Sequence, residues 1–156
     1  CRQASSFLWR CWPWRFKSAG IRSFPDFELS TEKARAALPE KVAHHDAVFN
    51  LARAALLAGS LTTGKLENVG VAVGDCLHQP YRFDLIPDGR DVVHAAKCMG
   101  ALGAFISGAG PSIIAIVDAS DKTYLSRAQM YCEQHFPHWT PIRLTCDEVG
   151  ATVTRF

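Results

Sequence analysis

The sequence predicts an α+β domain in which helices pack on one face of a mainly antiparallel sheet. Its 156 residues are 48% apolar, which is enough to form one hydrophobic core. Strand-like stretches occur near both ends and in the middle of the chain, and helical patterns lie between them. An order of strand, several helices, two strands, helix and strand is typical of helices segregated to one side of an antiparallel sheet.

The first expected elements are a strand and a short helix. Residues 16–24, FKSAGIRSF, form a plausible strand that Pro25 ends. Ser30 or Thr31 then caps a helix over the stretch TEKARAALP, because a side-chain oxygen at this position accepts a hydrogen bond from the first helical turn.

Two longer helices are expected next. His45 or Asp46 begins a helix over DAVFNLARAALLAG, whose apolar residues recur at a spacing of three to four, and we expect Gly59 to end it. Residues 66–82, LENVGVAVGDCLHQPYR, resemble a third helix that internal glycines loosen.

The second half of the chain alternates more regularly. The fourth expected helix is RDVVHAAKCMG, which follows Pro87 and Gly89, two residues that interrupt regular structure. Two apolar strands, ALGAFIS and SIIAIVDA, follow with GAGP between them. A fifth helix over KTYLSRAQMYCEQHF precedes one or two closing strands within residues 140–156.

Charge and cysteine usage exclude several classes of protein. The net charge is +2, and beyond residue 23 the acidic residues outnumber the basic ones, so a basic nucleic-acid-binding body is not expected. No apolar run approaches the ~20 residues that a membrane helix requires. The six cysteines form no Cys-x-x-Cys pair, and we expect reduced thiols in a cytoplasmic protein.

The beginning of the chain differs from the rest. Residues 1–15, CRQASSFLWRCWPWR, hold three tryptophans and three arginines without a clear period. We expect an atypical segment that is disordered or non-native, followed by one domain over residues 16–156. A cationic Trp/Arg segment at a membrane surface is the alternative interpretation.

Two motifs are decoys. Residues 59–65, GSLTTGK, match the front of a phosphate-binding P-loop, but Leu66 stands where Ser or Thr must hold Mg²⁺ and the stretch follows a helix instead of a strand. His135 and His138 have no carboxylate or thiol at ligand spacing, so no metal site is predicted.

Charged side chains at helical spacing form the first candidate site. Thr31 and Arg35 are four residues apart and share one helix face, where they could hold a small carboxylate or remain solvated. Asp75, His78 and Arg82 share a face of the third expected helix, where an ion pair between Asp75 and Arg82 is as plausible as a binding site.

The turn between the two central strands is the second candidate. In ISGAGPS, residues 106–112, glycines flank a single methyl group, so the backbone can adopt positive φ or approach another group closely. Successive exposed N–H groups would form an anion-binding nest. A tight hairpin turn with no ligand explains the same residues equally well.

Four stretches in order resemble a known family. They are PDFELSTEKARAALP, DAVFN, DCLHQPYR with LIP just after it, and GALGAFISGAGPSIIAI. Together they resemble the C-terminal half of homoserine kinase, in the GHMP small-molecule kinase superfamily. The resemblance extends over residues 16–156, about half of the family's usual length, and implies a ferredoxin-like GHMP kinase C-terminal domain.

The resemblance implies roles for particular residues. It implies ATP-dependent phosphorylation of L-homoserine to O-phospho-L-homoserine in threonine biosynthesis. Thr31, Arg35 and Arg82 match family positions that hold the amino-acid substrate. Ser107, Gly108, Ala109 and Gly110 match the superfamily's third motif, a glycine loop beside the substrate and the nucleotide phosphates. No catalytic residue is assigned.

The resemblance also implies that much of the site lies elsewhere. The family's phosphate loop, Pro-x-x-x-Gly-Leu-Gly-Ser-Ser, and its Mg²⁺-positioning carboxylate do not occur in these 156 residues. ATP and Mg²⁺ are therefore expected for the full-length family, with the metal ligands outside this chain. We expect the chain alone to be catalytically silent, because phosphoryl transfer depends on these groups.

Alternatives remain for the function and the assembly. Another GHMP kinase, acting for example on mevalonate or a sugar, would share the glycine loop. A non-catalytic module that binds a small amino acid would use the same arginines. The expected partners are L-homoserine and ATP, with neither nucleic acid nor membrane, and a homodimer is possible.

Overall fold

The computed structural model describes residues 18–144 as one layered domain. Residues 1–15, for which an atypical segment was expected, lie outside this range, as does most of the predicted closing strand region. In chain order the elements are β1 (Ser18–Pro25), α2 (Thr31–Ala36), α3 (His44–Thr63), η1 (Leu66–Asn68), α4 (Val69–Ala72), α5 (Gln79–Arg82), η2 (Phe83–Leu85), α6 (Gly89–Cys98), β2 (Gly103–Ile106), β3 (Ile113–Asp118), α7 (Tyr124–His135) and β4 (Trp139–Leu144).

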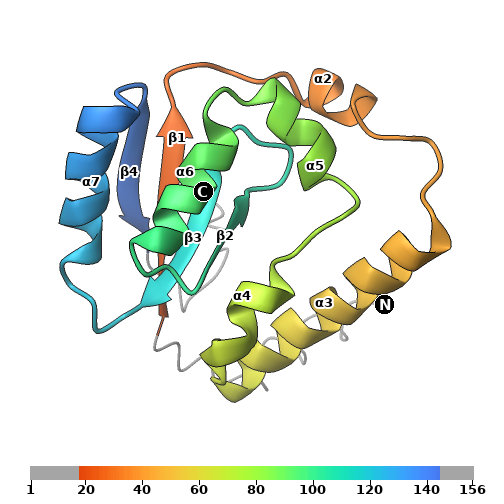
Figure 1. The fold of residues 1–156 in the computed structure, drawn as a ribbon, viewed down its shortest axis with the longest axis horizontal. Coiled ribbons are helices and arrows are strands. Elements are labelled where there is room, and N and C mark those ends of the chain that lie inside the picture. Colours follow the sequence, from red (N-terminus) through yellow and green to blue (C-terminus); the bar gives the residue numbers. More distant parts are fainter. Residues whose placement is uncertain (1–17, 145–156) are drawn as a thin grey trace, which may run out of the picture.

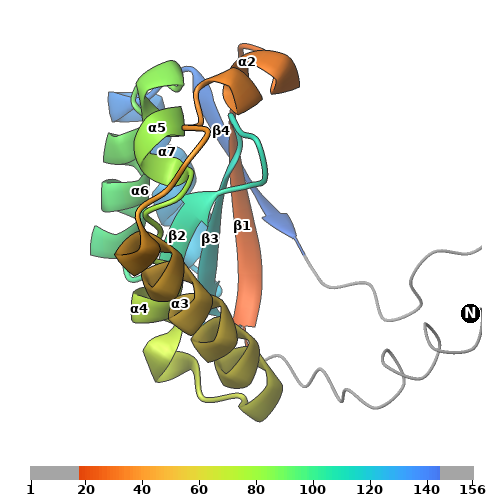
Figure 2. The ribbon, with the colours of Figure 1, turned by 90° about the vertical axis from the view of Figure 1, so that its right-hand side faces the viewer.

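The four strands form one antiparallel sheet in the order β2-β3-β1-β4. The first strand therefore lies inside the sheet, with Ser18 opposite Asp118 of β3 and Pro25 opposite Trp139 of β4. Helices α4 to α7 lie on one side of this sheet, with α6 and α7 against it, whereas α2 lies beyond one end of the sheet (Figure 1, Figure 2). The predicted α+β class is confirmed.

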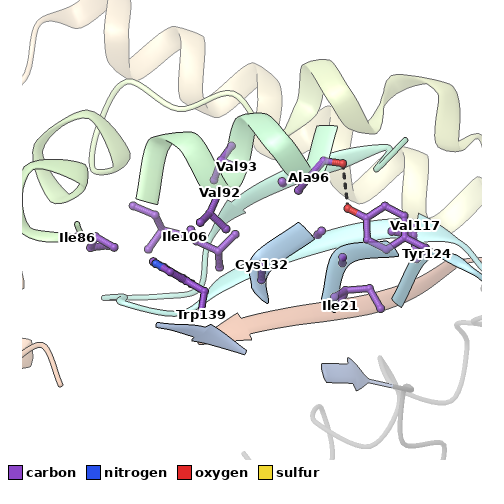
Figure 3. Packing of buried hydrophobic residues seen from close by; sticks show 14 residues of the cluster. Ile21, Ile86, Val92, Val93, Ala96, Ile106, Val117, Tyr124, Cys132 and Trp139 are labelled. Atoms are coloured by element: carbon purple, nitrogen blue, oxygen red, sulfur yellow. Dashed lines mark hydrogen bonds between the residues drawn. The ribbon is translucent and has the colours of Figure 1, made fainter. Parts of the chain in front are cut away.

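The core lies between the sheet and the two helices that cover it. Alternate residues of β3, Ile113, Ala115 and Val117, point into it, because successive side chains of a strand face opposite sides. Tyr124 of α7 is 1% exposed, and its hydroxyl donates to the carbonyl oxygen of Ala96 in α6 at 2.9 Å (Figure 3). This hydrogen bond satisfies the only polar atom of the tyrosine side chain and ties α7 to α6.

The long helix α3 ends later than expected. Gly59 lies inside it, and the helix continues to Thr63. Gly64 follows in the left-handed conformation, with φ of 71°, which is the usual way for glycine to end a helix. The P-loop interpretation of residues 59–65 is thereby excluded, because most of that stretch is helical.

The prediction of a single helix over residues 66–82 is wrong. The chain forms η1 and α4, leaves the helical path after Ala72, and begins α5 at Gln79. Asp75 lies in the break, and its carboxylate accepts hydrogen bonds from the backbone N–H groups of Leu77, His78 and Gln79. These bonds replace the helical ladder at this point and set a new helix direction.

Two further observations concern membrane spans and cysteines in the described part of the chain. None of its helices has the length and apolar character needed to cross a lipid bilayer. Cys76, Cys98 and Cys132 are free thiols, of which Cys132 is buried. Burial raises the pKa of the Cys132 thiol.

Candidate functional site

The glycine loop is the turn that joins β2 to β3. The N–H of Ser107 donates to the carbonyl of Ser112 at 2.8 Å, and the N–H of Gly110 donates to the carbonyl of Ser107 at 3.0 Å. The peptide bond from Gly110 to Pro111 is cis. Within residues 18–144, neither the Gly108 nor the Ala109 N–H has a hydrogen-bond partner. The loop is thus a closed hairpin turn that also leaves two adjacent donors available.

The two glycines of the loop have different surroundings. Gly108 has φ of 58° and Gly110 has φ of 88°, and both values lie in the left-handed region that favours glycine. A methyl group at Gly108 would meet no atom within 4 Å, whereas one at Gly110 would lie 2.9 Å from Cδ1 of Ile86. Gly110 is therefore needed for packing, and Gly108 keeps the outer side of the loop open.

Arg82 connects the glycine loop to α2. Its Nη1 donates to the carbonyl of Gly108 at 2.7 Å, and its Nε donates to the carbonyl of Ala34 at 3.2 Å. Nη1 also lies 3.3 Å from Nδ1 of His78. Nη2 has no hydrogen bond to a described residue, so that edge of the guanidinium is available. Three segments far apart in the sequence meet at this side chain.

Thr31 and Arg35 lie on α2, next to the carbonyl that Arg82 contacts. Ser30 caps this helix by accepting the N–H of Lys33 at 3.4 Å, as predicted. Thr31 and Arg35 are exposed, and their side chains form no hydrogen bond or ion pair with the described residues. Figure 1 shows α2, α5 and the turn between β2 and β3 at the same end of the molecule. The predicted site residues therefore gather at one end of the sheet.

A second arginine fixes the other side of the loop. Arg22 of β1 donates to Oγ of Ser112 from Nη2 at 2.9 Å and from Nε at 3.2 Å. Ser112 is buried at the beginning of β3 and is the residue that closes the turn. The loop is thus held at Gly108 by one arginine and at Ser112 by another, which limits its motion.

Asp75 organises the segment that carries Arg82. Besides three backbone N–H groups, its carboxylate accepts the Nδ2–H of Asn50 in α3, and Asn50 Oδ1 accepts the N–H of Cys76 at 2.8 Å. Partial burial raises the pKa of the Asp75 carboxyl, but the hydrogen bonds from Gln79, Asn50, His78 and Leu77 outweigh it and hold the pKa below its ordinary value. Asp75 is therefore an ionised cap for α5.

The proposed ion pair between Asp75 and Arg82 is not formed among the described residues. Nε2 of His78 instead lies 3.8 Å from Oδ1 of Asp75 and would form an ion pair with it only when the imidazole is protonated. Burial lowers the pKa of His78, Asp75 opposes this, and Arg82 lowers it further, so the pKa lies below its ordinary value. A neutral His78 is compatible with the approach of the Arg82 guanidinium to its Nδ1.

Two further residues position the site and were not singled out by the sequence patterns. Gln79 is buried, its Oε1 accepts the N–H of Ile106 at 3.0 Å, and its Nε2 donates to the carbonyl of Val73 at 3.3 Å. Asn50 is the other. The sequence held one signal for each residue: Asn50 is a polar residue among apolar neighbours in α3, and Gln79 directly precedes Pro80.

A metal centre is not found in this part of the chain. Within residues 18–144, no three His, Cys, Asp or Glu side chains are grouped so that they could hold a metal ion. Nδ1 of His138 instead lies 2.8 Å from the carboxylate of Asp26. The N–H groups of Gly108 and Ala109, which have no partner among the described residues, suit an anion, because backbone N–H groups in such turns bind phosphate or carboxylate oxygens.

The fold and the glycine turn agree with a family comparison. The model of the family "GHMP kinases C terminal" matches residues 52–138, and the chain belongs to this family. It corresponds to the carboxyl-terminal domain of small-molecule kinases of that superfamily.

Curated relatives that match the chain include homoserine kinases. The chain is 45% identical over 131 residues to a homoserine kinase from Caldicellulosiruptor saccharolyticus, a match that covers 83% of this chain and 42% of the relative. A homoserine kinase from Clostridium botulinum is 38% identical over 135 residues, covering 86% of this chain and 45% of the relative. The chain therefore spans less than half the length of these curated relatives.

A solved structure has the same fold. The crystal structure of homoserine kinase from Cytophaga hutchinsonii superposes with a TM-score of 0.77 at 28% identity, covering 86% of this chain and 42% of that one. Mevalonate kinase from L. major superposes with a TM-score of 0.60 at 16% identity, which is a likeness of fold alone.

Proposed function

We propose that this chain is the carboxyl-terminal half of an ATP-dependent homoserine kinase. The observation that carries the proposal is the bridge of Arg82 between Gly108 and Ala34, which gathers the predicted substrate residues and the glycine loop at one end of the domain. Two relatives that are 45% and 46% identical to the chain bear the name homoserine kinase. The γ-phosphoryl group of ATP would pass to the side-chain hydroxyl oxygen of L-homoserine; its bond to the bridging oxygen of ADP breaks, ADP leaves, and the hydroxyl proton is released.

Thr31, Arg35 and Arg82 would hold the amino-acid end of the substrate. Arg35 is exposed, and Nη2 of Arg82 has no hydrogen-bond partner among the described residues, so each guanidinium group would have donors for a carboxylate. Planar guanidinium groups pair with a carboxylate through parallel hydrogen bonds, which fixes orientation as well as charge. The Thr31 hydroxyl would add a neutral hydrogen bond on the same face of α2.

The glycine loop would contact phosphate oxygens through the N–H groups of Gly108 and Ala109. These donors are backbone atoms held by the loop geometry, so they need no reorganisation when a charged group arrives. The stretch between Ser107 and Gly110 would thereby serve positioning, which is the main contribution of protein groups to phosphoryl transfer. Mg²⁺ would be held by groups outside the described residues.

A steady-state assay tests the substrate assignment. The chain is mixed with the separately produced amino-terminal half of the Caldicellulosiruptor saccharolyticus relative, and ADP release is measured with L-homoserine. We expect release only in the mixture, and a KM for homoserine that rises at least about tenfold in Arg35→Ala, since a charge-assisted hydrogen bond is worth roughly 1.5–3 kcal/mol. Lys33→Ala, on the same helix, is the matched control and should leave KM within about twofold.

Two outcomes would contradict the proposal. ADP release that depends on ATP and homoserine from the chain alone would refute the need for an amino-terminal half, although it would support the kinase reaction. Calorimetric binding of homoserine or threonine to the chain alone, with no release in the mixture, would favour an amino-acid-binding module. The proposed cytoplasmic location is a separate expectation that localisation of a tagged chain would test.

A further inference from the structure

The side of the sheet that faces away from α6 and α7 carries a cavity. No described helix covers the sheet on this side (Figure 2). The cavity has a volume of about 520 Å³ and is bordered by β1, β4, the segment that follows β1, and the end of the glycine loop. Sites for small molecules are typically concave, with volumes of roughly 300–1,000 Å³. Its apolar walls include Phe24, Phe27, Leu29, Pro111 and Ile142.

Arg22 is the cation of this cavity. It lies on β1, opposite Ile114 of β3 and Ile142 of β4. Residues opposite each other on neighbouring strands point to the same face of a sheet, so the Arg22 side chain begins between two isoleucines. Its neighbour Ile21 points to the other face and is 1% exposed in the core. The guanidinium group therefore stands on an apolar surface, where a charge-assisted hydrogen bond is stronger than in water.

The protein uses only one edge of the Arg22 guanidinium group. Nε and Nη2 both donate to Oγ of Ser112, at 3.2 Å and 2.9 Å. Within residues 18–144, Nη1 donates to no other group, and no carboxylate forms an ion pair with Arg22. Nη1 carries two hydrogens and Nη2 keeps one, so the edge between them can donate two parallel hydrogen bonds to a carboxylate.

Glu28 limits the charge of a ligand. It also lines the cavity, and it forms no ion pair with the residues that the structure describes. A ligand with one carboxylate would have its charge matched by Arg22. A second negative group on the same ligand would have no cation of its own in the cavity and would be repelled by Glu28.

We propose that this cavity binds a small molecule with one carboxylate and an aromatic or branched apolar body. The carboxylate would accept hydrogen bonds from Nη1 and Nη2 of Arg22. The apolar body would pack on Phe24, which is 36% exposed, and on Ile142, which is 37% exposed. Covering these side chains removes apolar surface from water, which favours binding.

The cavity is distinct from the candidate site for the substrate. Thr31, Arg35 and Arg82 do not line it. Both sites border the glycine loop, because Arg82 contacts the carbonyl of Gly108 and Arg22 contacts Ser112. A carboxylate in the cavity would share Arg22 with Ser112 and would thereby fix a side chain that holds the loop. The proposal goes beyond the proposed function and does not rest on it.

Calorimetric titration of the full chain with 3-phenylpropionate tests the proposal. We expect saturable binding of one molecule per chain. Two comparison ligands each lack one part of the probe: 3-phenylpropan-1-ol lacks the charge, and propionate lacks the ring. Both should bind at least about tenfold more weakly. Phenylsuccinate, with a second carboxylate, should also bind more weakly than the probe because of Glu28.

Substitutions in the cavity locate the bound probe. Arg22→Gln should weaken the binding of 3-phenylpropionate at least about tenfold and change that of 3-phenylpropan-1-ol less than about twofold. Arg90→Gln is the matched control, because Arg90 is an exposed arginine of α6 that does not line the cavity, and it should change the affinity for the probe less than about twofold.

A second variant keeps the arginine in place. Arg22→Gln also removes the contact with Ser112, whereas Ile142→Glu leaves it intact. Residue 142 is directly opposite Arg22, so the new carboxylate can pair with the edge that the probe would use. We expect Ile142→Glu to weaken the binding of the probe at least about tenfold, with a melting temperature within a few degrees of the parent in circular dichroism.

The contrary results are distinct from those for the proposed function. No saturable binding, or binding that Arg22→Gln and Ile142→Glu both leave unchanged, would overturn the proposal. Equal affinity for propionate and 3-phenylpropionate would indicate an adventitious anion only and would overturn it as well. Displacement of the probe by L-homoserine would mean that the two share one site, against the proposal. Binding of the probe without ADP release in the kinase assay would refute only the kinase assignment.

Discussion

Alanine substitutions at Gly108 and Gly110 separate backbone strain from steric conflict within one turn. Both glycines have left-handed φ values, so alanine at either position pays a strain of roughly 1–2 kcal/mol. At Gly108 the added methyl group meets nothing within 4 Å. We therefore expect Gly108→Ala to lower the free energy of unfolding by about 1 kcal/mol, after the smaller entropy of its unfolded chain offsets part of the strain.

Gly110→Ala adds a packing conflict to the same strain. Its methyl group would lie 2.9 Å from Cδ1 of Ile86 and 3.3 Å from Cγ2 of Ile106. Both isoleucines are 2% exposed, so neither can move aside without disturbing the core. Overpacking of this kind costs roughly 1–3 kcal/mol, which brings the expected total to about 2–4 kcal/mol.

Urea denaturation followed by far-ultraviolet circular dichroism measures both variants. The difference between them should be at least about 1 kcal/mol, with unchanged dependence on urea concentration, which would indicate an unchanged unfolded state. If Gly108→Ala proves as destabilising as Gly110→Ala, the argument from the Ile86 contact is wrong. Because Gly108→Ala is expected to remain folded, the same variant can be used to measure whether a methyl group on the open side of the loop weakens phosphate binding.

Three other outcomes follow from described contacts. Asp75→Ala should lower the free energy of unfolding by about 2 kcal/mol in urea denaturation, since three backbone N–H groups and Asn50 lose their acceptor. Because the pKa of Asp75 is depressed in the folded state, this difference should be present above pH 4 and shrink as the pH falls through the folded pKa. A difference that does not change with pH would contradict the role of the Asp75 carboxylate as a cap for α5. Burial raises the pKa of Tyr124 from 10.0 to about 12, so stability should fall as pH rises between these values, and Tyr124→Phe should abolish that fall. The chain alone should bind a hydrophobic dye and self-associate, and Leu51→Glu should reduce both effects; a monomer without dye binding would count against an exposed apolar face.

The strands and most helices could be predicted because their periodicity reflects burial on one side. β3 alternates buried and partly exposed residues, and α6 buries Val92, Val93 and Ala96 at helical spacing. The end of α3 could not be predicted in the same way, because Gly59 and Gly64 are equally good signals in the sequence. Only Gly64 adopts a left-handed φ, whereas Gly59 is accommodated in the helix.

The break before α5 illustrates competition between side chain and backbone. The pattern over residues 66–82 has helical spacing, but the carboxylate of Asp75 takes three N–H groups that a continuous helix would use. Pro80 near the first turn of the new helix was a start signal, since proline is tolerated there. The relation between Asp75 and Asn50 depends on tertiary contact, so no local pattern reveals it.

The spacing in the sequence predicted Thr31 and Arg35 on one helix, whereas Arg82 lies on the short helix α5 instead of the single helix expected over residues 66–82. The spacing of Thr31 and Arg35 places them together on α2 in any helical interpretation. That Arg82 donates to backbone carbonyls of Ala34 and Gly108 depends on how three segments meet in space. The roles of all seven predicted site residues remain predictions until ligand binding is measured.

The central position of β1 has a consequence for the order of folding. This strand comes first in the described chain but pairs with β3 and β4, with Ser18 opposite Asp118 and Pro25 opposite Trp139. A growing polypeptide can form the helices between them early, whereas β1 must wait for β3, and the complete sheet for β4. Pairing between strands far apart in the sequence loses the conformational entropy of the intervening loop before stabilising contacts form, and this loss slows folding. During translation β1 therefore remains unpaired until β3 has been synthesised, and truncation before Trp139 would leave it with an open edge.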